Sequence, residues 1–401
     1  MKYFQTLLLA LLLTSGLAEA KARKIDDYHW TGVDRVVAIG DLHGDYAQYV
    51  NVMKSAGLIN KKGKWAGGKT HLVQTGDITD RGPDSRKIID HLVNLAKQAR
   101  KKGGYIHMLI GNHEAMNVVG DLRYVSDGEY KAFTGRNSAR YQELQWQRQI
   151  EWMRTNVPEF EEMDLEAYRL EWEKQVPLGW VEHRQAWSLN GDYGKWVEDN
   201  KVAIRINDTI FLHGGISAKY CKDSLQYLTE QVMAAMQSHD PSVVTIVNDP
   251  LGPLWYRGLA NTDESDEIYS QTLDNILSRY GIKRIVIGHS PTGGVVWPRF
   301  DQRVVANDTG IAGYYGAHFG LLELTAEGAF AIYGDRKMPL PTRNDDRVDY
   351  LRAVIEVDSN NAQLKQRLAA MLAPPAEDTA ESVEGEGDEA NEPIASPGTC
   401  Q

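Results

Sequence analysis

Residues 35–45 read RVVAIGDLHGD, a run of small and β-branched apolar residues that stops at a glycine and then turns polar. A short apolar run bounded by such a turn predicts a buried β-strand. The same arrangement recurs in THLVQTGDITDRG (70–82), GYIHMLIGNHE (104–114), DTIFLHGG (208–215) and IKRIVIGHS (282–290). The chain therefore repeats one design, in which a buried strand stops at a glycine beside Asp, Asn or His.

Segments with a helical pattern, residues 46–57, 84–102 and 266–280, separate several of these strands. Strands that alternate with helices predict an α/β fold, with one sheet covered by helices on both faces. In such folds the loops at the strand ends form the binding crevice. Residues 321–333, LLELTAEGAFAIY, predict a closing hairpin, and residues 364–372 predict a last helix.

The region from about 120 to 200 is rich in Glu, Gln, Arg and aromatic residues, and it predicts helices that are broken at Pro158. Trp146, Trp152, Tyr168 and Trp172 predict an apolar stripe on these helices. Such a stripe serves either as a packing surface or as the face of a helical cap over the strand ends. The sequence leaves both interpretations open.

The formal net charge of the 401 residues is −11, and eight of the acidic residues lie in 374–401, which contains no Lys or Arg. Without them the charge becomes −3, so the body of the chain is nearly balanced. This balance gives no support for nucleic-acid binding. The acidic, Pro-containing tail buries too little apolar surface to order itself and is predicted to be disordered.

Residues 1–20, MKYFQTLLLALLLTSGLAEA, have the three parts of a cleavable secretory signal. Lys2 supplies the positive start, residues 7–13 the apolar stretch, and Ala18 and Ala20 the small residues before a cut after Ala20. The apolar stretch is too short to span a bilayer, and no later segment predicts a membrane span. The mature chain is expected to be periplasmic or secreted.

The five strand ends together carry a set of carboxylates, imidazoles and one amide that can converge in one crevice. These side chains are Asp41, His43, Asp77, Asp80, Asn112, His113, His213 and His289. Such ligands suit Mn, Fe or Zn and exclude a thiolate site. Six ligands with one bridging carboxylate serve two divalent ions, which activate a water and clamp an oxyanion during in-line displacement. Arg81, beside Asp80, carries a guanidinium, whose N–H donors can bind two oxygens of a phosphoryl group at once.

The series GDLHG (40–44), GDITDRG (76–82), GNHE (111–114), HGG (213–215) and GHS (288–290) resembles the signature of the phosphoprotein phosphatases, a family of the calcineurin-like metallophosphoesterases. RYVSDGEY, GDYGKW, LWYRG and IGHSPTGG make the chain most similar to the bacterial Shewanella-like phosphatases. The resemblance covers about 36–333 and implies an α/β fold, a β-sandwich flanked by helices. It implies a catalytic domain at 33–340 with a cap-like helical insert at about 120–200, an extension at 341–372 and the acidic tail at 373–401.

The resemblance also implies a role for each candidate residue. The first metal is bound by Asp41 and His43, the second by Asn112, His213 and His289, and Asp77 bridges both. His113 is implied to be the general acid that protonates the leaving oxygen, with Asp80 as its orienting partner. Arg81 and Arg257, the latter in LWYRG, are implied to bind the substrate phosphate.

The predicted activity is that of a di-metal phosphomonoesterase that acts on a phosphorylated protein or peptide. A hydroxide that bridges the two ions is the implied nucleophile. Phosphotyrosine and phosphoserine or phosphothreonine stay open as substrates. A hydrolase of small phosphoesters, such as nucleotides or dinucleoside polyphosphates, is the alternative enzyme. A non-catalytic exported binding module is the alternative of a different class. The pairing of Cys221 with Cys400 is also left open.

Overall fold

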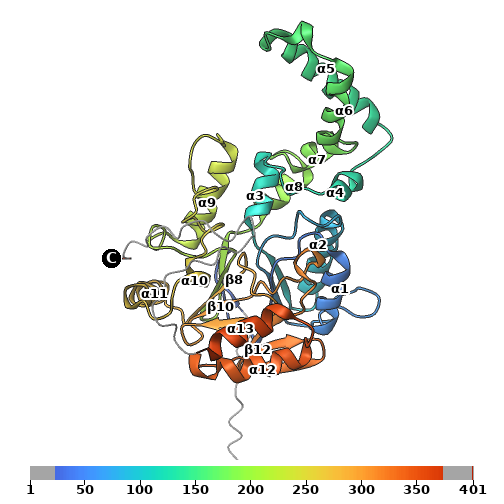
Figure 1. Ribbon diagram of the computed structural model, residues 1–401. Helices are drawn as coiled ribbons and strands as arrows, with labels where there is room; N and C mark the ends of the chain where they lie inside the picture. The colour runs from blue at the N-terminus through green and yellow to red at the C-terminus, as the bar shows by residue number, and fades with distance from the viewer. Residues whose placement is uncertain (1–22, 374–399, 401) are drawn as a thin grey trace, which may run out of the picture.

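Two β-sheets face each other in the computed structural model, which describes residues 23–373 and residue 400 (Figure 1). The strands predicted for one sheet are divided between these two sheets, so the prediction of a single sheet was wrong. The sandwich that the family resemblance implied is confirmed. The predicted signal peptide (1–20) and the acidic tail, except residues 373 and 400, lie outside the described residues.

The seven-stranded sheet has the order β1-β2-β6-β7-β8-β10-β9. Its strands are β1 (Arg23–Lys24), β2 (His29–Thr31), β6 (Ala203–Ile206), β7 (Thr209–Leu212), β8 (Arg284–Ile287), β9 (Trp297–Arg299) and β10 (Val304–Ala306). The six-stranded sheet has the order β13-β12-β11-β3-β4-β5. Its strands are β3 (Arg35–Ile39), β4 (His71–Gln74), β5 (Tyr105–Met108), β11 (Leu321–Thr325), β12 (Gly328–Tyr333) and β13 (Arg336–Pro339). In each sheet three neighbouring strands are parallel, β3, β4 and β5 in one and β7, β8 and β10 in the other.

The alternation of side chains along β3 explains why the strand is an unbroken apolar run. Val36 and Ala38 belong to the core between the two sheets, whereas Val37 and Ile39 belong to the core beneath the helices. Successive side chains of a strand point to opposite faces, so a strand that is covered on both faces must be apolar at every position.

Helices cover the outer faces of the sandwich. They include α1 (Tyr46–Ser55) and α2 (Ser85–Arg100) on the six-stranded sheet, and α9 (Leu225–Gln237), α10 (Gly258–Asn261) and α11 (Glu267–Tyr280) beside the seven-stranded sheet. Helices α12 (Arg347–Val357) and α13 (Ala362–Leu372) instead pack against the core between the two sheets. Asp45 and Asp266 cap α1 and α11 by accepting backbone N–H groups. The predicted starts of these two helices agree with the observed starts to within one residue. No helix within residues 23–373 is long and apolar enough to cross a bilayer.

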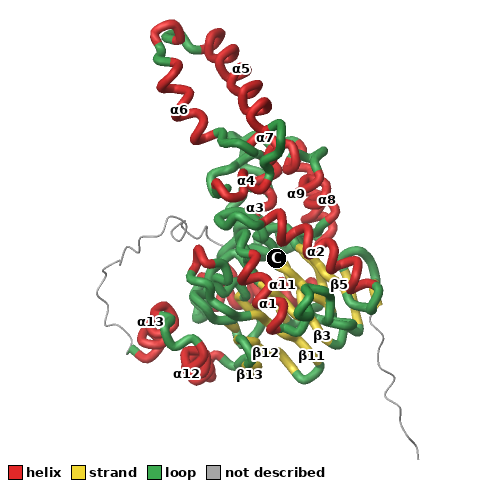
Figure 2. Tube along the Cα trace, turned by 90° about the vertical axis from the view of Figure 1, so that its right-hand side faces the viewer, coloured by secondary structure: helices red, strands yellow, loops and turns green. Residues whose placement is uncertain are grey.

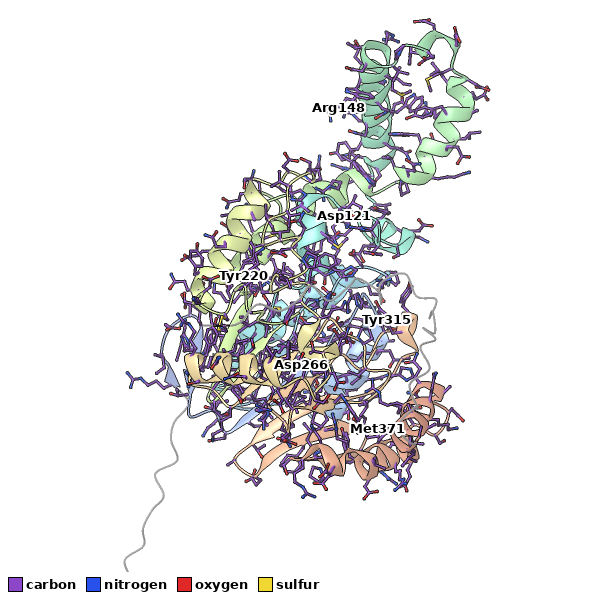
Figure 3. The ribbon with its side chains drawn as sticks, turned by 60° about the vertical axis from the view of Figure 1, so that its left-hand side comes forward. Asp121, Arg148, Tyr220, Asp266, Tyr315 and Met371 are labelled. Atoms are coloured by element: carbon purple, nitrogen blue, oxygen red, sulfur yellow. A yellow bond between two sulfur atoms is a disulfide. The ribbon has the colours of Figure 1, made fainter. Side chains whose placement is uncertain are left out.

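The region predicted to form a helical insert contains α4 (Asp127–Ala132), α5 (Ser138–Asn156), α6 (Leu165–Gln175), α7 (Trp180–Trp187) and α8 (Asp192–Asp199). Helices α5 and α6 form a two-helix arm (138–175) that projects away from the sandwich (Figures 1 and 2). In Figure 3, Arg148 lies on this arm, well beyond Asp121 near its base. The arm therefore does not lie over the strand ends as a cap.

The predicted aromatic stripe holds the arm together, except at one position. The ring of Trp146 lies 5.8 Å from that of Tyr168 and 5.2 Å from that of Trp172. Trp152, which was predicted to join them, is 58% exposed. Its inclusion in the stripe was wrong because the two helices pack along the Trp146 side of α5.

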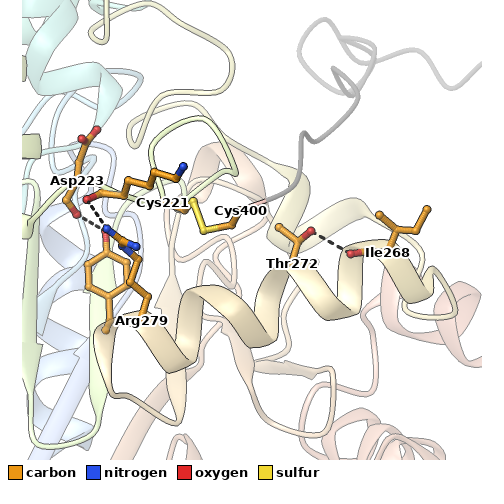
Figure 4. The surroundings of a disulfide bond; sticks show 8 residues. Cys221, Asp223, Ile268, Thr272, Arg279 and Cys400 are labelled. Atoms are coloured by element: carbon orange, nitrogen blue, oxygen red, sulfur yellow. Dashed lines mark hydrogen bonds between the residues drawn. A yellow bond between two sulfur atoms is a disulfide. The ribbon is translucent and has the colours of Figure 1, made fainter.

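A disulfide joins Cys221 to Cys400 and settles the pairing that the sequence left open. The bond lies beside α11 (Figure 4) and closes a sequence separation of 179 residues, with the two Cα atoms 6.1 Å apart. Both cysteines are buried in the apolar cluster on the outer face of the seven-stranded sheet. The cross-link thereby fastens residue 400 to the body of the protein.

We predict that Cys400→Ala lowers the free energy of unfolding by about 2–4 kcal/mol, because a cross-link over a long loop restricts the unfolded chain. Denaturant unfolding of the wild type and the variant, each with and without reductant, measures the effect. Reductant should destabilise the wild type and leave the variant unchanged. A wild type that is insensitive to reductant would contradict the prediction.

Candidate active site

The strand ends of the two sheets meet at one edge of the sandwich and bring the predicted residues together. His213, after β7, has its Nε2 atom 2.9 Å from Asn112 Oδ1 and 3.2 Å from Asp77 Oδ2. His43, after β3, has its Nε2 atom 3.9 Å from both Asp41 Oδ2 and Asp77 Oδ2. All five side chains are almost fully buried. Residues from opposite sheets therefore form one cluster.

Two groups of possible metal ligands share one carboxylate. In each group, one donor atom from every residue lies within 4.8 Å of the others; the groups are His43, Asp77 and His113, and Asp77, His213 and His289. Asp77 belongs to both, as expected of a bridging ligand. His113, which was expected to act as an acid, lies in the first group, while Asp41 lies beside that group at His43.

Each of the three predicted histidine ligands is held by a backbone carbonyl. The bonds run from His43 Nδ1 to the Thr79 carbonyl (3.0 Å), from His213 Nδ1 to the Thr75 carbonyl (3.0 Å) and from His289 Nε2 to the Trp255 carbonyl (3.1 Å). A carbonyl only accepts, so the bonded nitrogen carries the proton and the other nitrogen keeps its lone pair. This is the usual arrangement of a histidine that binds a metal.

The buried carboxylates of the cluster require cations. Burial and the nearby carboxylates of Asp308 and Asp77 raise the pKa of Asp41 well above its ordinary value. Several acids concentrated away from water are stable only if protons or metal ions compensate their charge. Carboxylate, imidazole and amide donors without a thiolate fit borderline divalent ions. The donor set therefore fits a pair of divalent metal ions.

Backbone strain is concentrated at this cluster. Ten described non-glycine residues have a positive φ, and five of them are predicted site residues. These are His43 (40°), Asp77 (57°), Asp80 (70°), Arg81 (63°) and His289 (63°). Such conformations are unfavourable for residues with a side chain and persist where the surroundings enforce them. Here they turn consecutive side chains sharply at the ends of the strands.

The glycines at the strand ends let the backbone approach the carboxylates. A Cβ atom at Gly111 would lie 2.1 Å from Asp77 Oδ1, and one at Gly288 would lie 2.6 Å from Asp41 Oδ1. Any larger residue would therefore displace a predicted metal ligand. The repeated glycine of the sequence pattern is explained by this close approach.

Glu114 ties two of the strand-end loops together. Its Oε2 atom accepts the backbone N–H groups of Asp77 and Gly111, each at 2.8 Å. Its Oε1 atom accepts those of Ile78 at 2.8 Å and Thr79 at 3.3 Å. The side chain is fully buried. One carboxylate thus sets the distance between the Asp77 loop and the start of α3 (Asn112–Val119).

His113 forms a buried pair with Asp80. His113 Nδ1 lies 2.7 Å from Asp80 Oδ2, and Asn117 Nδ2 donates to Asp80 Oδ1 at 2.8 Å. Burial lowers the pKa of His113, but the carboxylates of Asp77 and Asp80 outweigh it and raise the pKa to about 9. A protonated imidazole with Nδ1 held by a carboxylate leaves Nε2–H as a proton donor.

Aromatic rings surround the guanidinium of Arg81. Its central carbon lies 4.6 Å from the ring centroids of both Tyr124 and Tyr314, and 5.3 Å from that of Tyr315. Tyr124 also lies 5.0 Å from the ring of His113. Tyr315, which ends the short 3-10 helix η2 (Gly313–Tyr315), is labelled in Figure 3. Ring faces attract a guanidinium and restrict its orientation, so the cation is held beside the cluster.

Arg257, the second predicted phosphate-binding residue, lies on the other side of the cluster. Its Nη1 atom donates to the His289 carbonyl at 2.6 Å and lies 3.4 Å from Ser290 Oγ. Arg257 immediately precedes α10, which positions it beside the second group of donors. The structure therefore brings all ten predicted residues to one site; their individual roles stay predictions.

Sequence reasoning missed Asn307 and Asp308, which follow β10. Asp308 Oδ1 accepts the Gly310 N–H at 3.0 Å, whereas Asp308 Oδ2 and the Asn307 amide are buried without a hydrogen-bond partner among the described residues. Burial raises the pKa of Asp308 to about 6. VVANDTG (304–310) repeats the design of a buried strand with a polar end. Its three-residue strand is too short for periodicity to detect.

The matches to known proteins cover the part of the chain that contains this site. The family model for calcineurin-like phosphoesterases matches residues 34–293, which contain all five predicted strand ends. Shewanella-like protein phosphatase 2 of Arabidopsis thaliana is 28% identical over 273 residues, 64% of this chain and 66% of that protein. Shewanella-like protein phosphatase 1 of Plasmodium berghei is 24% identical over 340 residues, 83% of this chain and 77% of that protein.

A solved structure resembles most of this chain. It is the crystal structure of a cold-active protein-tyrosine phosphatase of a psychrophilic Shewanella species, with 26% identity and a TM-score of 0.59. The superposition covers 79% of this chain and 83% of that chain.

We predict that Glu114→Gln lowers the free energy of unfolding by about 3 kcal/mol and reduces metal content. The amide places N–H donors against backbone N–H donors and leaves buried groups unsatisfied. Denaturant unfolding and elemental analysis measure both effects. Glu198→Gln, at an exposed position on α8, is the matched control and should change neither. A Glu114→Gln protein with wild-type stability and metal content would refute the proposed role of Glu114.

Proposed function

Since the chain belongs to the calcineurin-like phosphoesterase family, we propose that it removes phosphate from phosphorylated proteins or peptides. The family and its phosphatase relatives make it a metal-dependent phosphoester hydrolase. The observation that carries the proposal is the pair of donor groups that share Asp77, with the His113–Asp80 pair beside them. Protein substrates are favoured because the relatives are named protein phosphatases and a structural neighbour is a protein-tyrosine phosphatase. Phosphotyrosine and phosphoserine or phosphothreonine are both included in the proposal.

In the proposed mechanism the chain supplies the cations that hold the phosphoryl group and the acid that releases the leaving group. Arg81, fixed between tyrosine rings, binds the phosphoryl oxygens from one side, and Arg257 does so from the other. Divalent ions at the carboxylate and histidine cluster supply an activated water and neutralise developing charge. Mn, Fe and Zn are the proposed ions.

His113 is proposed to give its Nε2 proton to the departing oxygen. Asp80 accepts the Nδ1–H bond and keeps the ring in one orientation, while Asn117 holds the second Asp80 oxygen. This chain of hydrogen bonds directs one proton toward the position of the leaving group. Asp80 is therefore a positioning residue.

We also propose that the protein acts outside the cytoplasm, in the periplasm or after secretion. The signal-peptide pattern of residues 1–20 supports this location. The Cys221–Cys400 disulfide supports it independently, because disulfides persist mainly in oxidising compartments.

Metal removal followed by a substrate panel tests the proposed function. We expect chelation to lower turnover at least about a hundredfold, and Mn²⁺, Fe²⁺ or Zn²⁺ to restore it. With metal restored, kcat/KM for a phosphotyrosyl or phosphoseryl peptide should exceed that for diadenosine tetraphosphate. Faster turnover of the dinucleotide would overturn the protein substrate, and full activity after verified metal removal would overturn the metal requirement.

We predict that His113→Asn reduces turnover of an alkyl phosphate by about a hundredfold or more, because the alkoxide leaves poorly without a proton. Turnover of p-nitrophenyl phosphate should fall much less, since its leaving group needs no proton. Metal content is measured alongside, because His113 lies within one donor group. Equal losses on both substrates at unchanged metal content would rule out the acid role.

A further inference from the structure

A groove of about 540 Å³ runs along β5, and none of the ten predicted site residues lines it. Residues 105–109 form one side of the groove. Helix α2, which lies beside β5 (Figure 2), supplies a second side, and the end of α8 with β1, β2 and β6 supplies the rest. The groove thus lies where the edges of the two sheets come together.

Strand β5 presents a free backbone edge to this groove. It is the last strand of its sheet. The N–H groups of Tyr105 and Leu109 donate to the carbonyls of Thr70 and Gln74, which lie on the β4 side. Alternate residues of a strand turn their backbone groups to opposite sides, so those of Ile106 and Met108 face the groove. Among the described residues, the only β-bridge on the groove side of this strand pairs Leu109 with Lys201. Ile106 and Met108 are only 4% and 9% exposed, but their backbone groups line the groove without a strand partner, and such an edge can accept a further strand.

The groove carries an excess of positive charge. Its charged lining consists of Lys24, Lys97, Arg100, Lys201, Asp27 and Asp199. Lys24 and Asp27 form an ion pair. Lys97, Arg100 and Lys201 form no ion pair with any residue of the described chain. With Asp27 and Asp199 counted against the four cations, the lining keeps a net charge of +2, which attracts an acidic occupant.

Aromatic side chains form the apolar part of the groove. Tyr105, Trp30 and Trp196 line it, and the ring of Trp30 lies 5.5 Å from that of Tyr105. The indole N–H groups of Trp30 and Trp196 are buried and find no hydrogen-bond partner in residues 23–373 or 400. These N–H groups are inaccessible to solvent, so the aromatic rings offer an occupant apolar contact only. An occupant with apolar side chains matches this part of the lining.

We propose that the β5 groove binds an extended acidic segment of a phosphoprotein substrate, which adds to β5 as a strand. The inference rests on the proposed function. Acidic side chains alternate with apolar ones in the segment, because successive residues of a strand face opposite ways. β5 leads toward Asn112 and His113, but Leu109 and Ile110 are paired with Lys201, so the free edge that a segment can join ends at Met108. The groove would hold the docking segment there, while a phosphorylated residue farther along the substrate reaches the cluster.

A binding assay on the full protein tests the groove without reference to catalysis. The probe is a fluorescein-labelled peptide of alternating Glu and Val, about six residues long to match a typical strand, with a Lys–Val peptide as control. We expect binding of the acidic probe only, weakened about tenfold by Lys97→Glu/Arg100→Glu. Lys61→Glu/Lys62→Glu, a matched pair of exposed lysines outside the groove, should bind like the wild type. Equal binding by both double variants would overturn the proposal.

Peptide N-methylation tests the addition of a strand. Two probes carry N-methyl groups on either the Glu or the Val amides, and only one set of amides faces β5 in a strand pair. We expect one probe to lose binding and the other to retain it. Equal binding by both probes would overturn strand addition.

Kinetics separate this proposal from the proposed function. With the acidic segment joined to a phosphotyrosyl residue, Lys97→Glu/Arg100→Glu should raise KM about tenfold and leave p-nitrophenyl phosphate kinetics unchanged. An unchanged KM would overturn substrate docking at the groove. A protein that is inert toward every phosphoester with metal restored would overturn the proposed function, while the binding assay would still decide whether the groove takes the acidic segment.

Discussion

The buried carboxylate of Glu114 is the constraint on which the site depends. It accepts backbone N–H groups from Asp77, Ile78 and Thr79 on one loop and from Gly111 on another. A buried charge is tolerated only when hydrogen bonds compensate its lost hydration. Satisfying this one group therefore fixes the two loops to each other. Asp77, the shared donor, and the start of α3 are positioned as a consequence.

The second requirement is that the two sheets face each other with their donor-bearing strand ends at the same edge. β4 and β5 supply Asp77 and Asn112, while β7 and β8 supply His213 and His289. The apolar core between the sheets holds these strand ends in contact. Neither sheet contains a complete set of donors. The hydrophobic core thus determines the chemistry of the site as well as the stability of the fold.

Strain and charge at this edge are compensated by the surrounding fold. His43, Asp80 and Arg81 hold left-handed backbone conformations in the loops that follow the parallel strands β3 and β4. Their loops are hydrogen-bonded across neighbouring strand ends, as in the bond from the Gly82 N–H to the His43 carbonyl. Unfavourable conformations cluster at functional sites because many contacts elsewhere can enforce them. The β-sandwich provides those contacts.

The sequence by itself determined the local features: buried strands, capped helices and the glycine beside each polar strand end. The strands and helices depend on side-chain periodicity and capping residues, which neighbouring positions specify. The glycines can be read in the sequence, but their close approach to Asp77 and Asp41 joins segments far apart in the chain. The sequence also identified nine of the ten candidate residues, because their types and order form one chemical pattern, whereas Arg257 was implied only by the family resemblance. Only the tertiary structure decided that the strands divide into two sheets, that Trp152 faces solvent and that Asp308 joins the cluster. The Cys221–Cys400 bond and the β5 groove were also decided only by the tertiary structure. Each depends on contacts between segments far apart in the chain, and local sequence does not encode which distant segments meet.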